Sequence, residues 1–274
     1  MKTDALELVC CPACHHDLTL TEASVSDDIE MGELVCGGCA KVYSIENGLP
    51  HFAAPQELVG KNKIAYWAQT LIFSRTYEQT VIKPMSYVFK MSEAEARREY
   101  LSCLQLAPGD KLLEIAVGPG PNLRYLHQMF NGVKLYALDL STGMLQQCAK
   151  NLKTWSVEAH LFQGLAEALP FKSNSFNVVL QVGGLNTFRD LKQALAEMLR
   201  VAKPGAQIVN VDEWLDPERL PRWWARALVR AVPALHQKTG PPLHLVPAEA
   251  VGKHCERIWN GCGYRLEFRK PASP

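Results

Sequence analysis

The hydrophobic pattern of the chain is clearest between residues 111 and 129. Residues 111–115 form a short apolar run typical of a buried strand, and residues 116–120 form a turn of small residues with two glycines. From Asn122 onward, apolar residues recur at helical spacing, at Leu123, Leu126 and Met129. A strand, a glycine turn and a helix start form a site for nucleotide-like ligands, because glycine allows close approach and the first helical N–H groups face the ligand. We expect the functional site at this corner.

The following residues alternate between strand-like and helix-like patterns. Strands are predicted over residues 133–139, 175–180 and 207–211, and helical patterns begin near Asn122 and directly after Asp139. Strands alternating with helices are typical of an α/β fold.

The end of the chain is predicted to hold one helix and one strand. We expect the helix over residues 247–260 and the strand over residues 261–269. Such a sheet has six strands unless residues 243–246 supply a short one. An open edge has to be covered, and our hypothesis is that a second copy of the chain (a homodimer) or the N-terminal segment covers it.

Two Cys-x2-Cys pairs near the N-terminus predict a metal site. Twenty-one residues separate the pairs, and four thiolates complete a closed tetrahedral site of the kind that holds structural zinc. Cys10 competes with its neighbour as a ligand, His15 and His16 are weaker substitutes, and four unrelated buried cysteines are the alternative. The predicted ligands are Cys11, Cys14, Cys36 and Cys39.

The residues after the second cysteine pair extend this pattern. Residues 42–52 follow xxxYxIxxGxPxF, with a typical hairpin turn at Asn47-Gly48. Together with the cysteines, they resemble the small zinc ribbons of the YbaR-like class, which often precede bacterial methyltransferase domains. The resemblance covers about residues 6–54 and implies a zinc-ribbon β domain over residues 1–54, ending near Ala53-Ala54-Pro55.

The turn at the glycine corner narrows the choice of ligand. Asp139 ends the second predicted strand, nineteen residues beyond Gly120, where an acid can bind both hydroxyls of a ribose. NAD and S-adenosylmethionine (SAM) both suit this arrangement. A dinucleotide-binding turn needs a third glycine where Leu123 stands, so a dehydrogenase is disfavoured.

Three later segments complete a family pattern. They are Gly164-Leu-Ala-Glu-Ala-Leu-Pro-Phe171, residues 175–180, and Glu197-Met-Leu-Arg-Val-Ala-Lys-Pro-Gly205. In this order they resemble class I SAM-dependent methyltransferases, most closely the UbiE-like (type 11) branch that includes quinone-biosynthesis C-methyltransferases. The resemblance covers about residues 75–213. It implies a Rossmann-like sheet with helices on both faces over residues 55–274 and SAM as cofactor.

The same resemblance implies which residues bind the cofactor. Asp139, with Leu140 beside it, is expected at the ribose, Met144 at the adenine face and Gln181 under the methionyl group. Leu165 stands where the family usually has an aspartate, so we expect weaker or differently arranged adenine recognition. Asn177 also replaces a usual aspartate, at a position that serves strand structure more than chemistry. The full set is Tyr77, Glu114, Ala116, Gly118, Gly120, Asp139, Leu140, Met144, Ala166, Glu167 and Gln181. No general base is identified, and Asp190 is expected to cap a helix.

Two further segments are expected around the cleft. Residues 55–109 should form a helical cap, in which Ser92 and Glu95 form a capping box for a helix running through Leu104. Residues 214–246 are interpreted as a lid insertion with a helix that carries two tryptophans and three arginines. Either the tryptophans pack on the sheet or the helix meets an anionic partner. These residues are Arg222, Trp223, Trp224, Arg226 and Arg230.

Composition narrows the class of partner. The net charge of +1 over 274 residues gives no general attraction to nucleic acid, and no apolar run approaches the roughly 20 residues of a membrane span. Nine cysteines suggest metal ligation or free thiols more than disulfides, and we expect a cytoplasmic protein.

Three functions remain open. The favoured one is a SAM-dependent methyltransferase for a small-molecule acceptor. A ribbon before a methyltransferase also resembles the bacterial rRNA guanine-N1 methyltransferases, so an rRNA or tRNA base is the second acceptor, disfavoured by the near-neutral charge. A non-catalytic binding or scaffold protein with a degenerate methyltransferase fold is the third, supported by Leu165 and Asn177.

Overall fold

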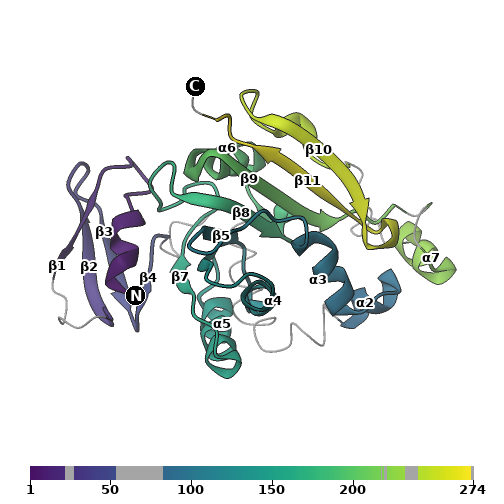
Figure 1. Ribbon diagram of the computed structural model, residues 1–274, viewed down its shortest axis with the longest axis horizontal. Coiled ribbons are helices and arrows are strands. Elements are labelled where there is room, and N and C mark those ends of the chain that lie inside the picture. Colours follow the sequence, from purple (N-terminus) through teal and green to yellow (C-terminus); the bar gives the residue numbers. More distant parts are fainter. Residues whose placement is uncertain (22–27, 54–82, 217, 219–220, 232–239, 273–274) are drawn as a thin grey trace.

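The structure is a computed structural model that describes residues 1–21, 28–53, 83–216, 218, 221–231 and 240–272. Figure 1 shows a small N-terminal sheet beside the edge of a larger mixed sheet, which carries helices on both faces. This is the α/β fold with a small N-terminal β domain that the sequence predicted.

The small sheet is antiparallel with the order β1-β2-β3-β4. Its hairpin turn was predicted correctly, because Asn47 (φ 50°) and Gly48 (φ 74°) both adopt the left-handed conformation that a two-residue hairpin turn needs. The elements are η1 (Thr3–Leu8), β1 (Leu18–Thr21), β2 (Met31–Cys36), β3 (Val42–Glu46) and β4 (Leu49–Pro50).

The large sheet has seven strands in the order β10-β11-β9-β8-β5-β6-β7. Strands β7, β6, β5, β8 and β9 are parallel, and β11 and β10 are antiparallel to their neighbours. The strands are β5 (Lys111–Ile115), β6 (Lys134–Asp139), β7 (His160–Gln163), β8 (Phe176–Val182), β9 (Ala202–Glu213), β10 (Val251–Ile258) and β11 (Gly263–Arg269). The helices are α2 (Lys83–Phe89), α3 (Glu93–Leu101), α4 (Pro121–Met129), α5 (Thr142–Trp155), α6 (Leu191–Val201) and α7 (Trp223–Ala231), with 3-10 turns η5 (Leu185–Thr187), η7 (Leu243–Leu245) and η8 (Trp259–Gly261).

The prediction for the end of the chain was wrong in two respects. Residues 251–258 form strand β10 instead of a helix, and residues 243–245 form a 3-10 turn instead of a strand. Pairing with β11 decides the conformation of β10, since strand preference depends on the neighbouring strand more than on the residue alone. Exposed polar residues, among them Lys253 and His254, mark β10 as a protected edge, so the seventh strand removes the reason for expecting a dimer there.

The capping residues predicted from the sequence do cap the starts of two helices. Ser92 and Glu95 form the predicted capping box of α3, although the helix ends at Leu101, before the predicted Leu104. The side chain of Asp190 accepts a hydrogen bond from the Gln193 N–H and caps α6, as expected.

Two apolar cores cover the faces of the large sheet. One contains residues of α4 and α5, and the other contains residues of α6. The second core continues without a break into the N-terminal domain, where Leu8, Leu34 and Phe52 belong to the same buried cluster as Phe162 and Phe171. The ribbon therefore shares a core with the larger domain.

Helix α7 packs on α2, and its Trp224 also packs against the apolar core on one face of the large sheet. The Trp224 ring stacks on the Tyr87 ring with centroids 5.5 Å apart, and Arg222 lies 4.1 Å from the same ring centroid. Trp223 is 80% exposed, so the expectation that both tryptophans pack on the sheet was wrong. Within the described residues, no helix has the length and apolar character needed to cross a membrane.

Candidate active site and metal centre

A pocket opens at the carboxyl ends of β5, β6 and β8, where α/β sheets commonly bind ligands. Eight of the eleven predicted cofactor residues line it. They are Glu114, Ala116, Gly118, Asp139, Leu140, Met144, Ala166 and Glu167.

The other three predicted residues are placed differently. Gly120 begins α4, and a Cβ atom there would lie 2.5 Å from the Cys148 sulfur, so this glycine permits close packing of α4 on α5. Gln181 is fully buried and donates a hydrogen bond of 2.7 Å to the Gly183 carbonyl. Tyr77 lies outside the described residues.

Asp139 is held at the tip of β6 by two backbone donors. Its Oδ2 atom accepts from the Gly118 N–H and its Oδ1 atom from the Ser141 N–H, both at 2.8 Å. Burial raises the pKa of Asp139 to about 6, against the lowering effect of these hydrogen bonds. Each carboxylate oxygen has a second lone pair, so the side chain can still accept from two hydroxyl groups.

Glu114 lies in a buried network on the other side of the turn. Its Oε1 atom accepts from Asn122 at 2.6 Å, and the Asn122 carbonyl oxygen in turn accepts from Arg97 and from Tyr100. Burial raises the pKa of Glu114 to about 7. No sequence pattern indicates the roles of Arg97, Tyr100 and Asn122, because these side chains meet only through the packing of α3 against α4.

One atom of this network points to a ligand. Among the described residues, the Oε2 atom of Glu114 has no hydrogen-bond partner, although Glu114 is only 1% exposed and lines the pocket. An unpaired buried carboxylate oxygen is costly unless a donor or a cation meets it. SAM carries an ammonium group, a sulfonium and two ribose hydroxyls, so Glu114 and Asp139 fit it. Leu165 also lines the pocket and offers no polar contact there.

The pocket also has an aromatic wall. Phe89 and Trp259 lie there with their rings stacked 5.3 Å apart, and the Trp259 indole N–H donates to the Ala96 carbonyl. Phe188 also lines the pocket. A flat apolar molecule fits such walls. Sequence patterns missed this wall, because Trp259 arrives from the turn after β10, where a helix was expected.

Two neighbouring acids, Asp212 and Glu213, stand at the end of β9. Glu213 lines the pocket, while Asp212 is fully buried and accepts from the Leu185 N–H and the Glu213 N–H, both at 2.9 Å. Burial, reinforced by neighbouring Glu213, raises the pKa of Asp212 well above its usual range. Asp212 thereby fixes the loop of Gly183 and Gly184, which also line the pocket.

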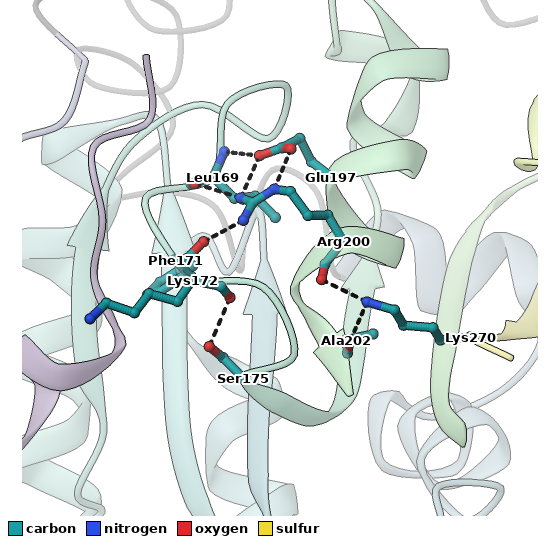
Figure 2. A network of polar contacts seen from close by, with 8 residues as sticks. All are labelled: Leu169, Phe171, Lys172, Ser175, Glu197, Arg200, Ala202 and Lys270. Carbon is teal, nitrogen blue, oxygen red and sulfur yellow. Dashed lines mark hydrogen bonds and ion pairs between the residues drawn. The ribbon is translucent and has the colours of Figure 1, made fainter. Parts of the chain in front are cut away.

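A second polar network anchors the loop that follows Glu167 of the pocket lining. Figure 2 shows Glu197 and Arg200 of α6 around the backbone of residues 169–171. Glu197 accepts from the Leu169 N–H at 2.8 Å, and Arg200 donates to the Leu169 and Phe171 carbonyls at 3.0 and 2.6 Å. Lys270 donates to the Arg200 carbonyl in turn. The two family motifs, Leu169-Pro-Phe171 and Glu197-x-x-Arg200, are therefore joined in one hydrogen-bonded network, which we call the clasp.

The four predicted cysteines meet at the metal site. Their sulfur atoms all lie within 4.8 Å of one another, and tetrahedral zinc with bonds of about 2.3 Å places sulfurs about 3.8 Å apart. Backbone N–H groups of Gly38 and Cys39 point at the Cys36 sulfur, both at 3.4 Å, which favours a thiolate. Cys10 is not part of the cluster, so the predicted register is confirmed. The residues present therefore fit structural zinc.

The buried acids predict how stability depends on pH. Glu114, with a usual pKa of 4.5, titrates at about 7 in the ligand-free fold, and Asp139, with a usual pKa of 3.8, titrates at about 6. The folded chain holds these protons more tightly than the unfolded chain, so the stability they contribute at low pH is lost as pH rises to about 7. For Glu114 the loss is about 3 kcal/mol.

Urea unfolding at pH 4.5 and pH 7.5 measures this loss. In Glu114→Gln, the free energy of unfolding is expected to change less between the two pH values. In the exposed control Glu249→Gln, it is expected to change as much as in wild type. A wild-type slope in Glu114→Gln would contradict the assignment.

Comparisons with known proteins agree with both parts of the chain. Residues 113–210 match the family described as "Methyltransferase domain", and residues 2–48 match the family "Trm112p-like protein". A demethylmenaquinone methyltransferase from Renibacterium salmoninarum is 35% identical over 159 residues, and one from Paenarthrobacter aurescens is 32% identical over 160. These matches cover 57% of this chain in each case, but only 64% and 60% of the relatives.

Solved structures show the same fold at low identity. A geranyl diphosphate C-methyltransferase from Streptomyces coelicolor has a TM-score of 0.58 at 11% identity, with 80% of this chain and all of that chain covered. A chain from the complex of the Haloferax volcanii Trm112 methyltransferase activator with a putative methyltransferase has a TM-score of 0.52 at 14% identity, covering 74% of this chain and 97% of that one. The fold, the metal centre and the family matches agree: over residues 113–210 the chain is similar to methyltransferase domains, among them those of demethylmenaquinone methyltransferases, and over residues 2–48 it is similar to Trm112p-like proteins.

Proposed function

We propose that the chain is a SAM-dependent methyltransferase that methylates a flat, apolar small molecule of the quinol type. The unpaired Glu114 oxygen in the pocket carries this proposal, because it offers a buried anionic partner for the ammonium group of SAM. The demethylmenaquinone methyltransferases among the relatives and the aromatic wall at Phe89 and Trp259 support the acceptor class.

Each side of the pocket has a role in this proposal. Asp139 accepts from the ribose hydroxyls, Met144 and Leu140 pack on the adenine, and Ala166 and Glu167 border its edge. Gly118 has open space where a Cβ atom would stand, so the backbone can approach the methionine part. Gly120 and Gln181 shape the turn and the neighbouring loop from behind, and Tyr77 remains a prediction.

The chemistry needs a positioned acceptor and a proton acceptor. Bound SAM supplies a methyl group that its sulfonium makes electrophilic. Phe89 and Trp259 orient the ring of the acceptor. Glu213 takes the proton that the acceptor gives up as the new carbon–methyl bond forms, and Asp212 keeps Glu213 and the glycine loop in place.

RNA is the less well supported class of methyl acceptor. Five acids line the pocket, which would repel the phosphates of a nucleic acid. They are Glu93, Glu114, Asp139, Glu167 and Glu213. A cytoplasmic location fits the biosynthetic relatives and belongs to the proposal, whereas a homodimer remains an untested prediction.

The decisive experiment combines binding with product mass. Calorimetry should show SAM and S-adenosylhomocysteine binding to the zinc-loaded chain, with weaker binding for Glu114→Gln. Incubation with SAM and a panel of quinols, phenols and RNA should add one methyl group to a quinol. Absence of SAM binding would overturn the enzyme in favour of the scaffold protein, and a methylated RNA would overturn the acceptor class.

A further inference from the structure

The zinc ribbon reaches the methyltransferase pocket through its last described residues. His51 pairs in parallel with Gln163, the last residue of β7, and the Phe52 N–H donates to the Gln163 carbonyl at 2.8 Å. The ribbon thus extends the edge of the large sheet next to β7, where Figure 1 shows β4 beside it. This edge is the opposite one from the edge at which docking was expected.

The side chain of Gln163 joins three segments. It is fully buried, its Nε2 atom donates to the Ala53 carbonyl at 2.9 Å and to the Leu140 carbonyl at 3.1 Å, and its Oε1 atom accepts from the Ala53 N–H at 3.1 Å. Only a side chain with both a donor and an acceptor group can make this set of bonds. Gln163 therefore ties the end of the ribbon to the residue that follows Asp139.

The tied residues form the wall of the cofactor pocket. Leu140 and Leu165 line the pocket, and behind it both pack against Ala53, which is 5% exposed. The Gly164 N–H donates to the Asp139 carbonyl at 3.1 Å. A shift of Ala53 would therefore reach the surface that faces the adenine.

The same segment is in contact with the metal centre. The Tyr43 hydroxyl lies 3.2 Å from the Cys11 sulfur, and the Tyr43 ring packs on the Phe52 ring with centroids 5.2 Å apart. Phe52 directly precedes Ala53. A second link runs from the Cys10 N–H to the Pro170 carbonyl, beside the clasp of Figure 2.

We propose that Gln163 is a positioning residue that couples the metal-held ribbon to the cofactor pocket, so that losing either the metal or this amide weakens cofactor binding. The proposal rests on the proposed function, since it concerns the same pocket. Gln163 touches no reacting atom, and its effect passes through Leu140 and Ala53.

Gln163→Met, which keeps the side-chain length and removes the amide, tests the link in the metal-loaded chain. We expect S-adenosylhomocysteine to bind roughly 5- to 20-fold more weakly by calorimetry, a normal size for coupling between sites. KM for SAM should rise while kcat changes little. The matched control is Gln207→Met, since Gln207 is equally buried and ties Gln105, Cys103 and Glu267 together at a distance from the pocket lining. Equal effects of the two variants, or none for Gln163→Met, would overturn the proposal.

Metal removal gives a second test. Chelation should weaken binding in wild type and in Gln207→Met, and should add little in Gln163→Met, because the link is already cut. If the chelated chains unfold, the comparison of Gln163→Met with Gln207→Met in the zinc-loaded chain decides alone. If Gln163→Met fails to fold, amide exchange of wild type decides: residues 139–141 and 164–167 should exchange faster after partial chelation, and unchanged exchange would refute the coupling. A wild-type chain that binds no SAM would overturn the proposed methyltransferase function. Amide exchange after partial chelation would still decide whether Gln163 couples the ribbon to the pocket.

Discussion

Glu213→Gln is expected to lower kcat about 100-fold or more and to leave the affinity for SAM unchanged. Glu213 lines the pocket at the end of β9, which is separated by β8 from β5 and β6, the strands that carry Glu114 and Asp139. Glutamine keeps the size and most of the contacts but accepts no proton at neutral pH. The loss should therefore fall on the chemical step.

Steady-state rates with a quinol acceptor, together with calorimetry of S-adenosylhomocysteine, separate the two effects. Glu249→Gln, an exposed acid outside the pocket lining, is the matched control and should behave as wild type. Asp212→Asn should act differently, because Asp212 holds the Leu185 N–H and not the acceptor. A normal kcat in Glu213→Gln would remove this residue from the mechanism.

Removing zinc is expected to destabilise the whole chain by several kcal/mol, within the roughly 10–16 kcal/mol that structural zinc provides in isolated finger peptides. The reason is the shared core, in which Leu8, Leu34 and Phe52 of the ribbon pack in one cluster with Phe162 and Phe171. Loss of the metal should therefore lower the single melting temperature of the chain. A ribbon that shared no core with the rest of the chain would instead melt in a separate transition.

Scanning calorimetry before chelation, after chelation and after zinc is restored measures this effect. Cys36→Ser should reproduce the chelated state, and Cys255→Ser, at a cysteine outside the metal cluster, should melt as wild type does. Two transitions, with the larger one unmoved by chelation, would show that the ribbon is energetically separate.

Local chemistry made much of the structure predictable. The cysteine register, the Asn47-Gly48 turn and the Ser92 capping box each depend on residues a few positions apart, and each was correct. The position of Asp139 was predictable because strand ends meet at one edge of a parallel sheet. The domain boundary near residue 54, the helical cap and the lid remain predictions.

Long-range packing accounts for what the sequence left out. Strand β10 was mistaken for a helix because only its partner β11 reveals its conformation. Asn122 was predicted only as the start of a helix, and α4 does begin beside it. Its side chain also connects Glu114 to α3, which no sequence pattern indicated. Likewise, Gln163 is an unremarked polar residue in the sequence until the ribbon lies beside it.

The arrangement of the sheet edges has a consequence for how the chain is synthesised. The ribbon lies along one edge at β7, and β11, which is made after both of its neighbours, inserts between β9 and β10 at the other edge. A ribosome releasing this chain from its N-terminus would therefore present a ribbon that can take up zinc early. Its docking partner, Gln163, emerges more than one hundred residues later. The cofactor pocket can be completed only after Glu213 and Trp259 of its lining have been made, so newly made chains depend on the early metal-bound ribbon staying intact during that interval.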